Sequence, residues 1–210
     1  MRVHWKMFIY LIRHGQTEYN VGEPRFRGQT DIPLSEEGIK QAELIANELK
    51  NVPIDKIYYS PLIRAKLTAE KIYYYHPHAL FLNEPLLITL NFGDWQGKFH
   101  KDVFKTEEKK KLWHTNPHAF IIPNGETFYE VLDRIQRLFF SLQNHGEKNI
   151  VLVTHRVVIS LILIYLFKLH PSHFWDFQVD TASITQIRYK SFDDFRLKKF
   201  NMVSHLLNAK

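Results

Sequence analysis

Arg13-His14-Gly15 is the part of the chain whose residue types point most directly to chemistry. It follows an apolar run at residues 7–12, which has the length and composition of a buried strand. Ligands of open α/β sheets bind beyond the carboxyl ends of the strands, so an anion could bind here. Arg13 offers a planar fork of donors for phosphate oxygens. His14 can attack phosphorus when one ring nitrogen is unprotonated and the other is held by a hydrogen bond. Gly15 would allow a tight turn and a close approach to the ligand.

Thr154-His155 repeats this arrangement far along the chain. It ends the apolar strand predicted at residues 149–154, and an apolar helix is predicted from Arg156. Two histidines at the ends of neighbouring strands can face each other across one site. Each histidine alone would be explained more simply as a polar residue with a structural hydrogen bond, and it is the pair that favours a functional site.

Arg64 is a candidate second clamp for an anion. It lies in the first turn of a helix predicted at residues 60–75, directly after a strand predicted at residues 56–59. From there it can point back over the strand end, where the helix N-terminus also favours an anion. An arginine in a first helical turn is usually just exposed, so this interpretation rests on its place after a strand.

Predicted strands and helices alternate along the chain. The remaining elements are helices at residues 35–50, 101–113 and 125–144, strands at 79–82, 183–189 and 196–201, and a loop rich in aromatic residues at 83–100. This alternation predicts a three-layer α/β/α sandwich with a mostly parallel central sheet. The 210 residues are expected to form one domain.

The composition excludes several classes of function. The absence of cysteine removes disulfides, cysteine nucleophiles and thiolate metal sites, and it fits a reducing compartment. A net charge of +6 would attract either nucleic acid or small phosphorylated molecules, but no nucleic-acid motif is visible. No metal-ligand spacing occurs among the twelve histidines. No secretory signal is recognisable, and the longest apolar stretch, at 157–167, is too short to span a bilayer. We therefore expect a cytoplasmic protein without a membrane or nucleic-acid partner.

Six separated motifs resemble, in this order, those of the histidine phosphatase superfamily, which includes the cofactor-dependent phosphoglycerate mutases. They are LIRHGQTEYN at 11–20, RFRGQTDIPLSEEGIKQA at 25–42, YYSPLIRAKLTAEKI at 58–72, FGDWQGK at 92–98, PNGETFYEVLDRI at 123–135 and VLVTHRVVI at 151–159. The PNGET block and FWDFQVDTASIT at 174–185 look most like the α-ribazole phosphatase branch.

The resemblance implies a role for each matching residue. His14 would attack the phosphate and become a phosphohistidine, which water then hydrolyses without a metal or other cofactor. The transferring phosphoryl group would be held by Arg13, Arg64 and His155. Binding of the substrate is expected from Thr17, Asn20, Gln29 and Thr30. Glu126 matches an acidic position of the family, where it would either orient His14 or cap its own helix.

Thr89 departs from the family pattern. A glutamate commonly stands there, three residues before the aromatic of the FGDW-type motif, and protonates the leaving oxygen. Threonine is not an acid of this kind, and a missing general acid costs ~100- to 10,000-fold in rate. Glu84 is the first candidate for a replacement, with Asp94 and Glu18 as further ones. A substrate with a good leaving group would need no acid, and Thr89 would then only contact it.

Arg156 is a second departure, because the family usually has a small residue after the second histidine. It could bind a second anionic group of the substrate, crowd the pocket or point to solvent. The aromatic residues of segment 83–122 could stack on a flat part of the substrate, although core packing is their commoner use.

The sequence therefore predicts a metal-independent phosphatase that hydrolyses a small phosphomonoester, with α-ribazole phosphate as one candidate. The alternative is a degenerate, slow or inactive member that binds phosphorylated ligands, for which Thr89 and Arg156 are the support. A phosphoglycerate mutase is less expected, because the family's mutases carry additional substrate-enclosing segments. The oligomeric state is left open.

Overall fold

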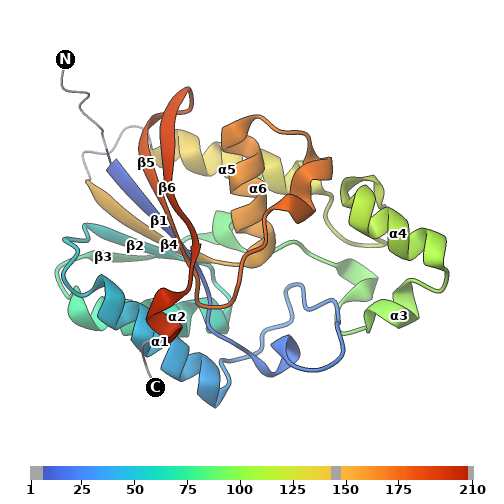
Figure 1. Cartoon of the computed structure of the whole chain (residues 1–210), viewed down its shortest axis with the longest axis horizontal. Coiled ribbons are helices and arrows are strands. Elements are labelled where there is room, and N and C mark those ends of the chain that lie inside the picture. The colour runs from blue at the N-terminus through green and yellow to red at the C-terminus, as the bar shows by residue number, and fades with distance from the viewer. Residues whose placement is uncertain (1–6, 143–147, 208–210) are drawn as a thin grey trace.

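The computed structural model describes residues 7–142 and 148–207, and its centre is one six-stranded sheet (Figure 1). The strand order is β3-β2-β4-β1-β5-β6. The strands are β1 (Met7–Arg13), β2 (Lys56–Tyr59), β3 (Leu80–Asn83), β4 (Asn149–Thr154), β5 (Ile184–Ser191) and β6 (Asp194–Met202). The first four are parallel to one another, whereas β5 and β6 are antiparallel additions at one edge. The predicted mostly parallel sheet is confirmed.

Helices cover both faces of this sheet (Figure 1). Four of them do so: α1 (Glu36–Leu49) and α2 (Ile63–Tyr75) on one face, and α5 (Phe128–Leu142) and α6 (Arg156–Phe167) on the other. The chain also forms the helices α3 (His100–Val103), α4 (Glu107–Thr115) and α7 (Ser204–Leu207). Residues of α1 and α2 form one core cluster with the sheet, and residues of α5 and α6 form the other. This is the α/β/α sandwich that the sequence predicts. No helix within residues 7–142 and 148–207 is long and apolar enough to cross a membrane.

The apolar run of β1 is explained by burial on both faces. Ile9 and Leu11 pack in the cluster of α5 and α6, whereas Tyr10 and Ile12 pack in the cluster of α1 and α2. Successive side chains of a strand point to opposite faces, so a strand between two helical layers needs apolar residues at every position.

Two of the predicted helices differ in the structure. The helix α2 begins at Ile63 and not at Ser60, because the Ser60 N–H donates to the carbonyl of Val153 and so continues the ladder of β2. The helix predicted at residues 101–113 is divided into α3 and α4, because the Thr106 hydroxyl accepts the N–H of Lys109 and caps a new helix. The end predicted for α5 at Asn144 lies outside the described residues.

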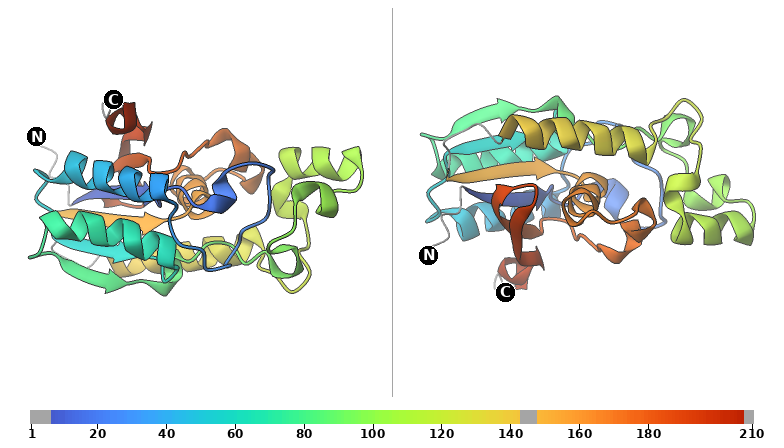
Figure 2. Two further views of the ribbon diagram at one scale, coloured as in Figure 1. Left: turned by 90° about the horizontal axis from the view of Figure 1, so that it is seen from below. Right: turned by 90° about the horizontal axis from the view of Figure 1, so that it is seen from above.

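The segment with α3 and α4 lies at the end of the molecule toward which β4 points (Figure 2). It is joined to the loop after β1 by an aromatic cluster around the buried Phe26. The ring of Phe26 lies 4.9 Å from that of Phe92, 5.2 Å from Trp95 and 5.5 Å from Trp113. Phe92 and Trp113 are buried, so their main use is core packing, and the cluster forms one wall beyond the strand ends.

Candidate active site

The register of β1 and β4 places His14 and His155 side by side. Arg13 is paired with Thr154, so each histidine follows directly after the last pair of the two strands. The backbone N–H of His14 donates to the carbonyl of Thr154 at 3.0 Å. The two imidazole rings are 5.1 Å apart between centroids, with 60° between their planes. The prediction that the two strand-end histidines meet is confirmed.

His14 is held in a single useful orientation by its own loop. Its Nδ1 lies 2.7 Å from the carbonyl oxygen of Gly15. A carbonyl only accepts, so Nδ1 carries the proton and Nε2 keeps its lone pair. Burial, with the positive charges of Arg64 and Arg13, lowers the pKa of His14 well below its ordinary value. The ring is therefore neutral at neutral pH, with Nε2 free.

Gly15 lacks a side chain because the first turn of α1 packs against it, and not because a left-handed turn requires glycine. Its φ is not positive, and a Cβ there would lie 2.4 Å from the carbonyl oxygen of Gly38 in the first turn of α1. The same turn is joined to the loop by Ser35, which accepts the N–H of Gly38 and donates its own N–H to the carbonyl of Gln16. The missing side chain thus allows α1 to pack backbone to backbone against the residues after His14.

Arg13 and Arg64 bring two buried cations to His14, and neither forms an ion pair with a carboxylate among the described residues. Arg13 Nη1 donates to the carbonyl of Val179 at 2.5 Å. Arg64 donates from Nη1 to Thr30 and from Nη2 to Gly28, both carbonyls at 2.9 Å. The Nε of each arginine is buried and has no partner among the described residues. Such unpaired donors are costly unless a ligand accepts from them, and an anion fits here.

Burial lowers the pKa of Arg13 to about 9 and that of Arg64 to about 10, so both guanidinium groups stay charged at neutral pH. The charge that an anion would meet is therefore permanent under ordinary conditions.

His155 lies beside His14 and, together with Arg13 and Arg64, completes the group of residues around it. Its Nε2 lies 2.7 Å from the hydroxyl of Ser60, and its Nδ1 is buried without a partner among the described residues. Burial, followed by the charge of Arg64, lowers its pKa well below the ordinary value. The sequence analysis did not single out Ser60, although a polar residue at the end of β2 was a usable signal.

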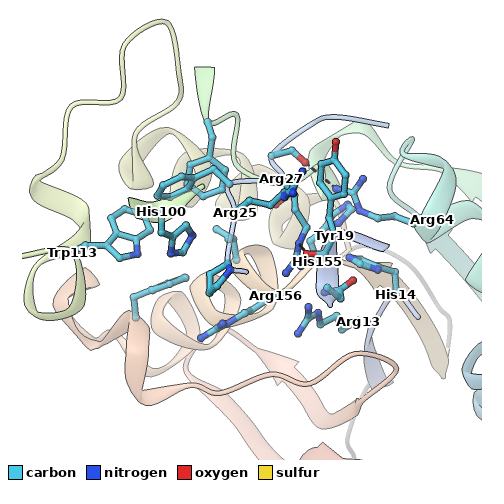
Figure 3. Close-up of a pocket in the computed structure, with 18 of the residues that line it drawn as sticks. Arg13, His14, Tyr19, Arg25, Arg27, Arg64, His100, Trp113, His155 and Arg156 are labelled. Carbon is cyan, nitrogen blue, oxygen red and sulfur yellow. Dashed lines mark hydrogen bonds between the residues drawn. The ribbon is translucent and has the colours of Figure 1, made fainter. Parts of the chain in front are cut away.

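These residues form one end of a pocket of about 310 Å³. In the view of Figure 3, His100 and Trp113 lie at the other end, and between the two ends lie Arg25, Arg27 and Arg156. Arg25 and Arg27 were not among the residues predicted from the sequence. Two arginines flanking an aromatic residue in a loop were the signal that could have found them.

Only half of the predicted substrate contacts line the pocket. Asn20, Thr89 and Arg156 do so. The other three, Thr17, Gln29 and Thr30, support residues that line it.

Each of these three makes a defined contact. The Thr17 hydroxyl donates to Asn20 Oδ1 at 2.8 Å, and Gln29 Nε2 donates to the carbonyl of Thr89 at 3.1 Å. The Thr30 carbonyl accepts from Arg64. The printed contacts of Thr17 and Gln29 use their side chains inside the loops, whereas that of Thr30 uses only its backbone carbonyl, so a contact of these three side chains with substrate stays a prediction.

The structure does not bring Glu84 to the pocket. Its carboxylate accepts the N–H of Leu86 at 2.9 Å and caps the 3-10 helix η2 (Pro85–Leu87). Asp94 accepts from Asn124, and the exposed Glu18 does not line the pocket either. None of the three carboxylates named as a possible general acid therefore lies where it could reach a leaving group.

Thr89 itself is buried and does line the pocket. The one carboxylate among the described lining residues is that of Glu23, which forms an ion pair with Lys101 at 2.8 Å. The position where the family commonly has its glutamate general acid is thus occupied by the hydroxyl group of Thr89.

Glu126 has neither of the two roles expected of it. Its carboxylate accepts the N–H of Asn91 at 2.9 Å and pairs with Arg134 at 3.1 Å. Arg134 also donates to the carbonyl of Leu86 at 2.7 Å, so the pair holds both ends of the segment that carries Thr89. The start of α5 is capped instead by a capping box, in which the Thr127 hydroxyl accepts the N–H of Glu130 and the Glu130 carboxylate accepts the N–H of Thr127.

The two buried histidines should make the protein less stable in acid. Their pKa values are lowered in the folded protein, so the unfolded chain binds more protons below about pH 6.5. The free energy of unfolding is then highest above that pH and falls as the pH decreases, by up to about 1.4 kcal/mol per pH unit for each histidine.

Urea unfolding between pH 7.5 and 5 checks this expectation. We expect a smaller slope for the double variant His14→Asn/His155→Asn than for the wild type, and an unchanged slope for His78→Ala, which alters an exposed histidine. Equal slopes for wild type and double variant would show that these two groups do not control the acid sensitivity.

Comparison with known proteins identifies the family. The sequence pattern of the histidine phosphatase superfamily (branch 1) matches residues 9–203. Phosphoserine phosphatase 1 of Hydrogenobacter thermophilus is 33% identical to this chain over 201 aligned residues. The alignment covers 94% of this chain and 93% of that protein. Adenosylcobalamin/alpha-ribazole phosphatase of Salmonella typhimurium is 31% identical over 83% of this chain and 86% of its own.

Solved structures agree with the sequence comparison. The alpha-ribazole phosphatase from Shigella flexneri superposes with a TM-score of 0.83 at 29% identity, over 93% of this chain and 96% of that chain. The protein YhfR of Bacillus stearothermophilus gives a TM-score of 0.86 at 28% identity, over 95% and 99%. Fold and strand-end site thus define a phosphoglycerate mutase-like α/β protein. The chain belongs to the histidine phosphatase superfamily, branch 1, and is a phosphatase, a hydrolase; small phosphorylated substrates are typical of this family.

Proposed function

We propose that this phosphatase hydrolyses a small phosphomonoester through a covalent phosphohistidine on His14, without a metal ion. The observation that carries the proposal is the hydrogen bond from His14 Nδ1–H to the Gly15 carbonyl. It leaves the Nε2 lone pair in a pocket where Arg13 and Arg64 have donors without partners. A neutral imidazole beside unpaired cations suits attack on a phosphate.

In the proposed reaction, His14 Nε2 forms a bond to phosphorus while the bond to the ester oxygen breaks. The charge on the transferring phosphoryl oxygens is balanced by the guanidinium groups of Arg13 and Arg64, and the neutral His155 adds a hydrogen-bond donor from the same lining. The alcohol departs with a proton from solvent, since the one carboxylate of the described lining, that of Glu23, is paired with Lys101. Water then attacks the phosphohistidine, and inorganic phosphate leaves with His14 restored.

Two substrates follow from the relatives. One relative is a phosphoserine phosphatase and the other an adenosylcobalamin/alpha-ribazole phosphatase, with similar identity to this chain. Phosphoserine and α-ribazole phosphate are both small phosphomonoesters, and the segment 174–185 favours α-ribazole phosphate. The aromatic end of the pocket, with His100 and Trp113, supports a substrate that has a flat part.

Thr89 supports a second candidate function. A slow or inactive member of the family would bind phosphorylated ligands with the same arginines but would release no product at a useful rate. The buried hydroxyl of Thr89, at the position of the usual acid, is the observation that favours this alternative.

A phosphate-release assay with phosphoserine, α-ribazole 5′-phosphate and 4-nitrophenyl phosphate separates the two functions. We expect turnover of all three, fastest for the nitrophenyl ester because its leaving group needs no proton. Binding of inorganic phosphate measured by calorimetry, together with no release from any ester, would instead establish the binding protein.

A further inference from the structure

The pocket holds more positive charge than one phosphate group needs. Besides Arg13 and Arg64 at the His14 end, it is lined by Arg27 and Arg156. None of these four guanidinium groups forms an ion pair with a carboxylate in the part of the chain that the structure describes. A phosphomonoester dianion would balance two of the four charges and leave two unbalanced.

Arg156 is fixed so that its guanidinium faces the pocket. It is the first residue of α6, directly after His155. The guanidinium lies over the ring of Trp175 at 4.9 Å from the centroid, and Nη2 donates to Gln178 Oε1 at 3.0 Å. Its Nε is buried without a partner among the described residues. These contacts position the charge but do not neutralise it, and they exclude the expectation that Arg156 points freely to solvent.

Arg27 reaches the same part of the pocket from the loop after β1. Its Nε donates to the carbonyl of Tyr19 at 2.7 Å, which leaves both terminal nitrogens for other partners. Burial and the nearby charge of Arg156 lower the pKa of Arg27 to about 10. The two cations thus repel each other across the pocket, and an anion between them would remove this repulsion.

The neighbouring charged groups do not supply that anion. Arg25 is itself a cation, and its guanidinium is enclosed by the rings of Tyr19 at 4.5 Å and Phe99 at 4.2 Å. Asp180 acts on Arg156 from a distance, but its carboxylate accepts from Asn201 Nδ2 at 2.8 Å and makes no ion pair with Arg156.

We propose that the pocket takes phosphorylated substrates whose leaving group carries a second anionic group, a carboxylate or a phosphate, and that Arg156 binds this group together with Arg27. The inference rests on the proposed function, since it names the substrate class of the same site. Of the two candidate substrates it favours phosphoserine, which carries a carboxylate, over α-ribazole phosphate, whose leaving group has no second anionic group. A charge-assisted hydrogen bond to such a group contributes enough to change affinity by about 10- to 100-fold.

Three phosphonates with the same two-carbon spacer test the proposal: ethylphosphonate, 3-phosphonopropionate and 1,2-ethylenediphosphonate. They contain a carbon–phosphorus bond and are not hydrolysed, so calorimetry measures binding alone. For the wild type we expect 3-phosphonopropionate or ethylenediphosphonate to bind about 10- to 100-fold more tightly than ethylphosphonate. The compound that shows the advantage tells whether the second group is a carboxylate or a phosphate.

In Arg156→Ala the affinity ratio of the better of these two compounds to ethylphosphonate should fall to within about threefold of one. In Arg156→Lys the ratio should be partly kept, because lysine keeps the charge but loses the planar fork. The matched control is Arg137→Ala, which removes the same charge from an exposed arginine on α5 that pairs with Asp133. Its ratio should equal that of the wild type.

Equal binding of all three phosphonates to the wild type would overturn the proposal, as would an undiminished ratio in both Arg156 variants. A clear advantage lost in Arg156→Ala, together with no ester hydrolysis, would uphold the second anion site while refuting the proposed hydrolysis. The two failures are therefore distinguishable.

Discussion

Replacing His14 by alanine is expected to lower kcat/KM for 4-nitrophenyl phosphate by about 10⁴-fold or more. The variant loses the nitrogen that forms the bond to phosphorus, and the other histidine at this end of the described lining, His155, has its Nε2 engaged with the hydroxyl of Ser60. Rapid acid-free quenching of the wild type, followed by mass spectrometry of its peptides, should find a phosphoryl group on the peptide that contains His14 and none in the variant.

Two controls separate chemistry from folding. His14→Asn keeps a polar side chain in the buried position and should be as inactive as His14→Ala while unfolding close to the wild-type temperature. His78→Ala changes an exposed histidine and should keep full activity. Substantial turnover by both His14 variants would exclude the covalent mechanism.

Introducing a carboxylic acid at Thr89 is expected to increase hydrolysis of alkyl phosphates by ~100- to 10,000-fold, the usual contribution of a general acid. Thr89 lines the pocket, so Thr89→Glu puts the new group where a leaving oxygen can meet it. Hydrolysis of 4-nitrophenyl phosphate should change little, because nitrophenolate leaves without a proton.

The matched control is Thr89→Gln, which has nearly the same shape as the glutamate variant but no proton to give at neutral pH. It should show no gain with either ester. Glu84→Gln should also behave like the wild type, because the Glu84 carboxylate caps η2 outside the pocket. Selective loss of alkyl ester hydrolysis in Glu84→Gln would show instead that this carboxylate moves to the site during the reaction.

The strand-end part of the site could be predicted because it follows from chain order and sheet geometry. Apolar runs locate β1 and β4, and parallel neighbours deliver their next residues to one edge, so His14 and His155 were expected to meet. Arg64 follows a strand in the same way, and it lines the same pocket as the two histidines even though α2 begins later than predicted.

The loop part could not be predicted, because loop side chains are positioned by contacts between segments distant in sequence. Glu84 is close to Thr89 in the chain, yet a local N–H takes its carboxylate. Glu126 is used by Arg134 and Asn91, a pairing that no spacing rule indicates. Arg27 reaches the pocket only because Phe26 beside it is packed among aromatic residues of a segment some seventy residues later, as its contact with Trp95 shows.

The Glu126–Arg134 pair has a consequence for how such an enzyme can evolve. It fixes the backbone of the segment that carries Thr89 at Leu86 and Asn91, without using the Thr89 side chain. Position 89 can therefore exchange one residue for another while the surrounding backbone stays in place. His14 and His155 directly follow the central strands β1 and β4 and are independent of this change. Mutational drift at one position can thus retune which leaving groups are accepted, while the phosphate-binding end is inherited unaltered.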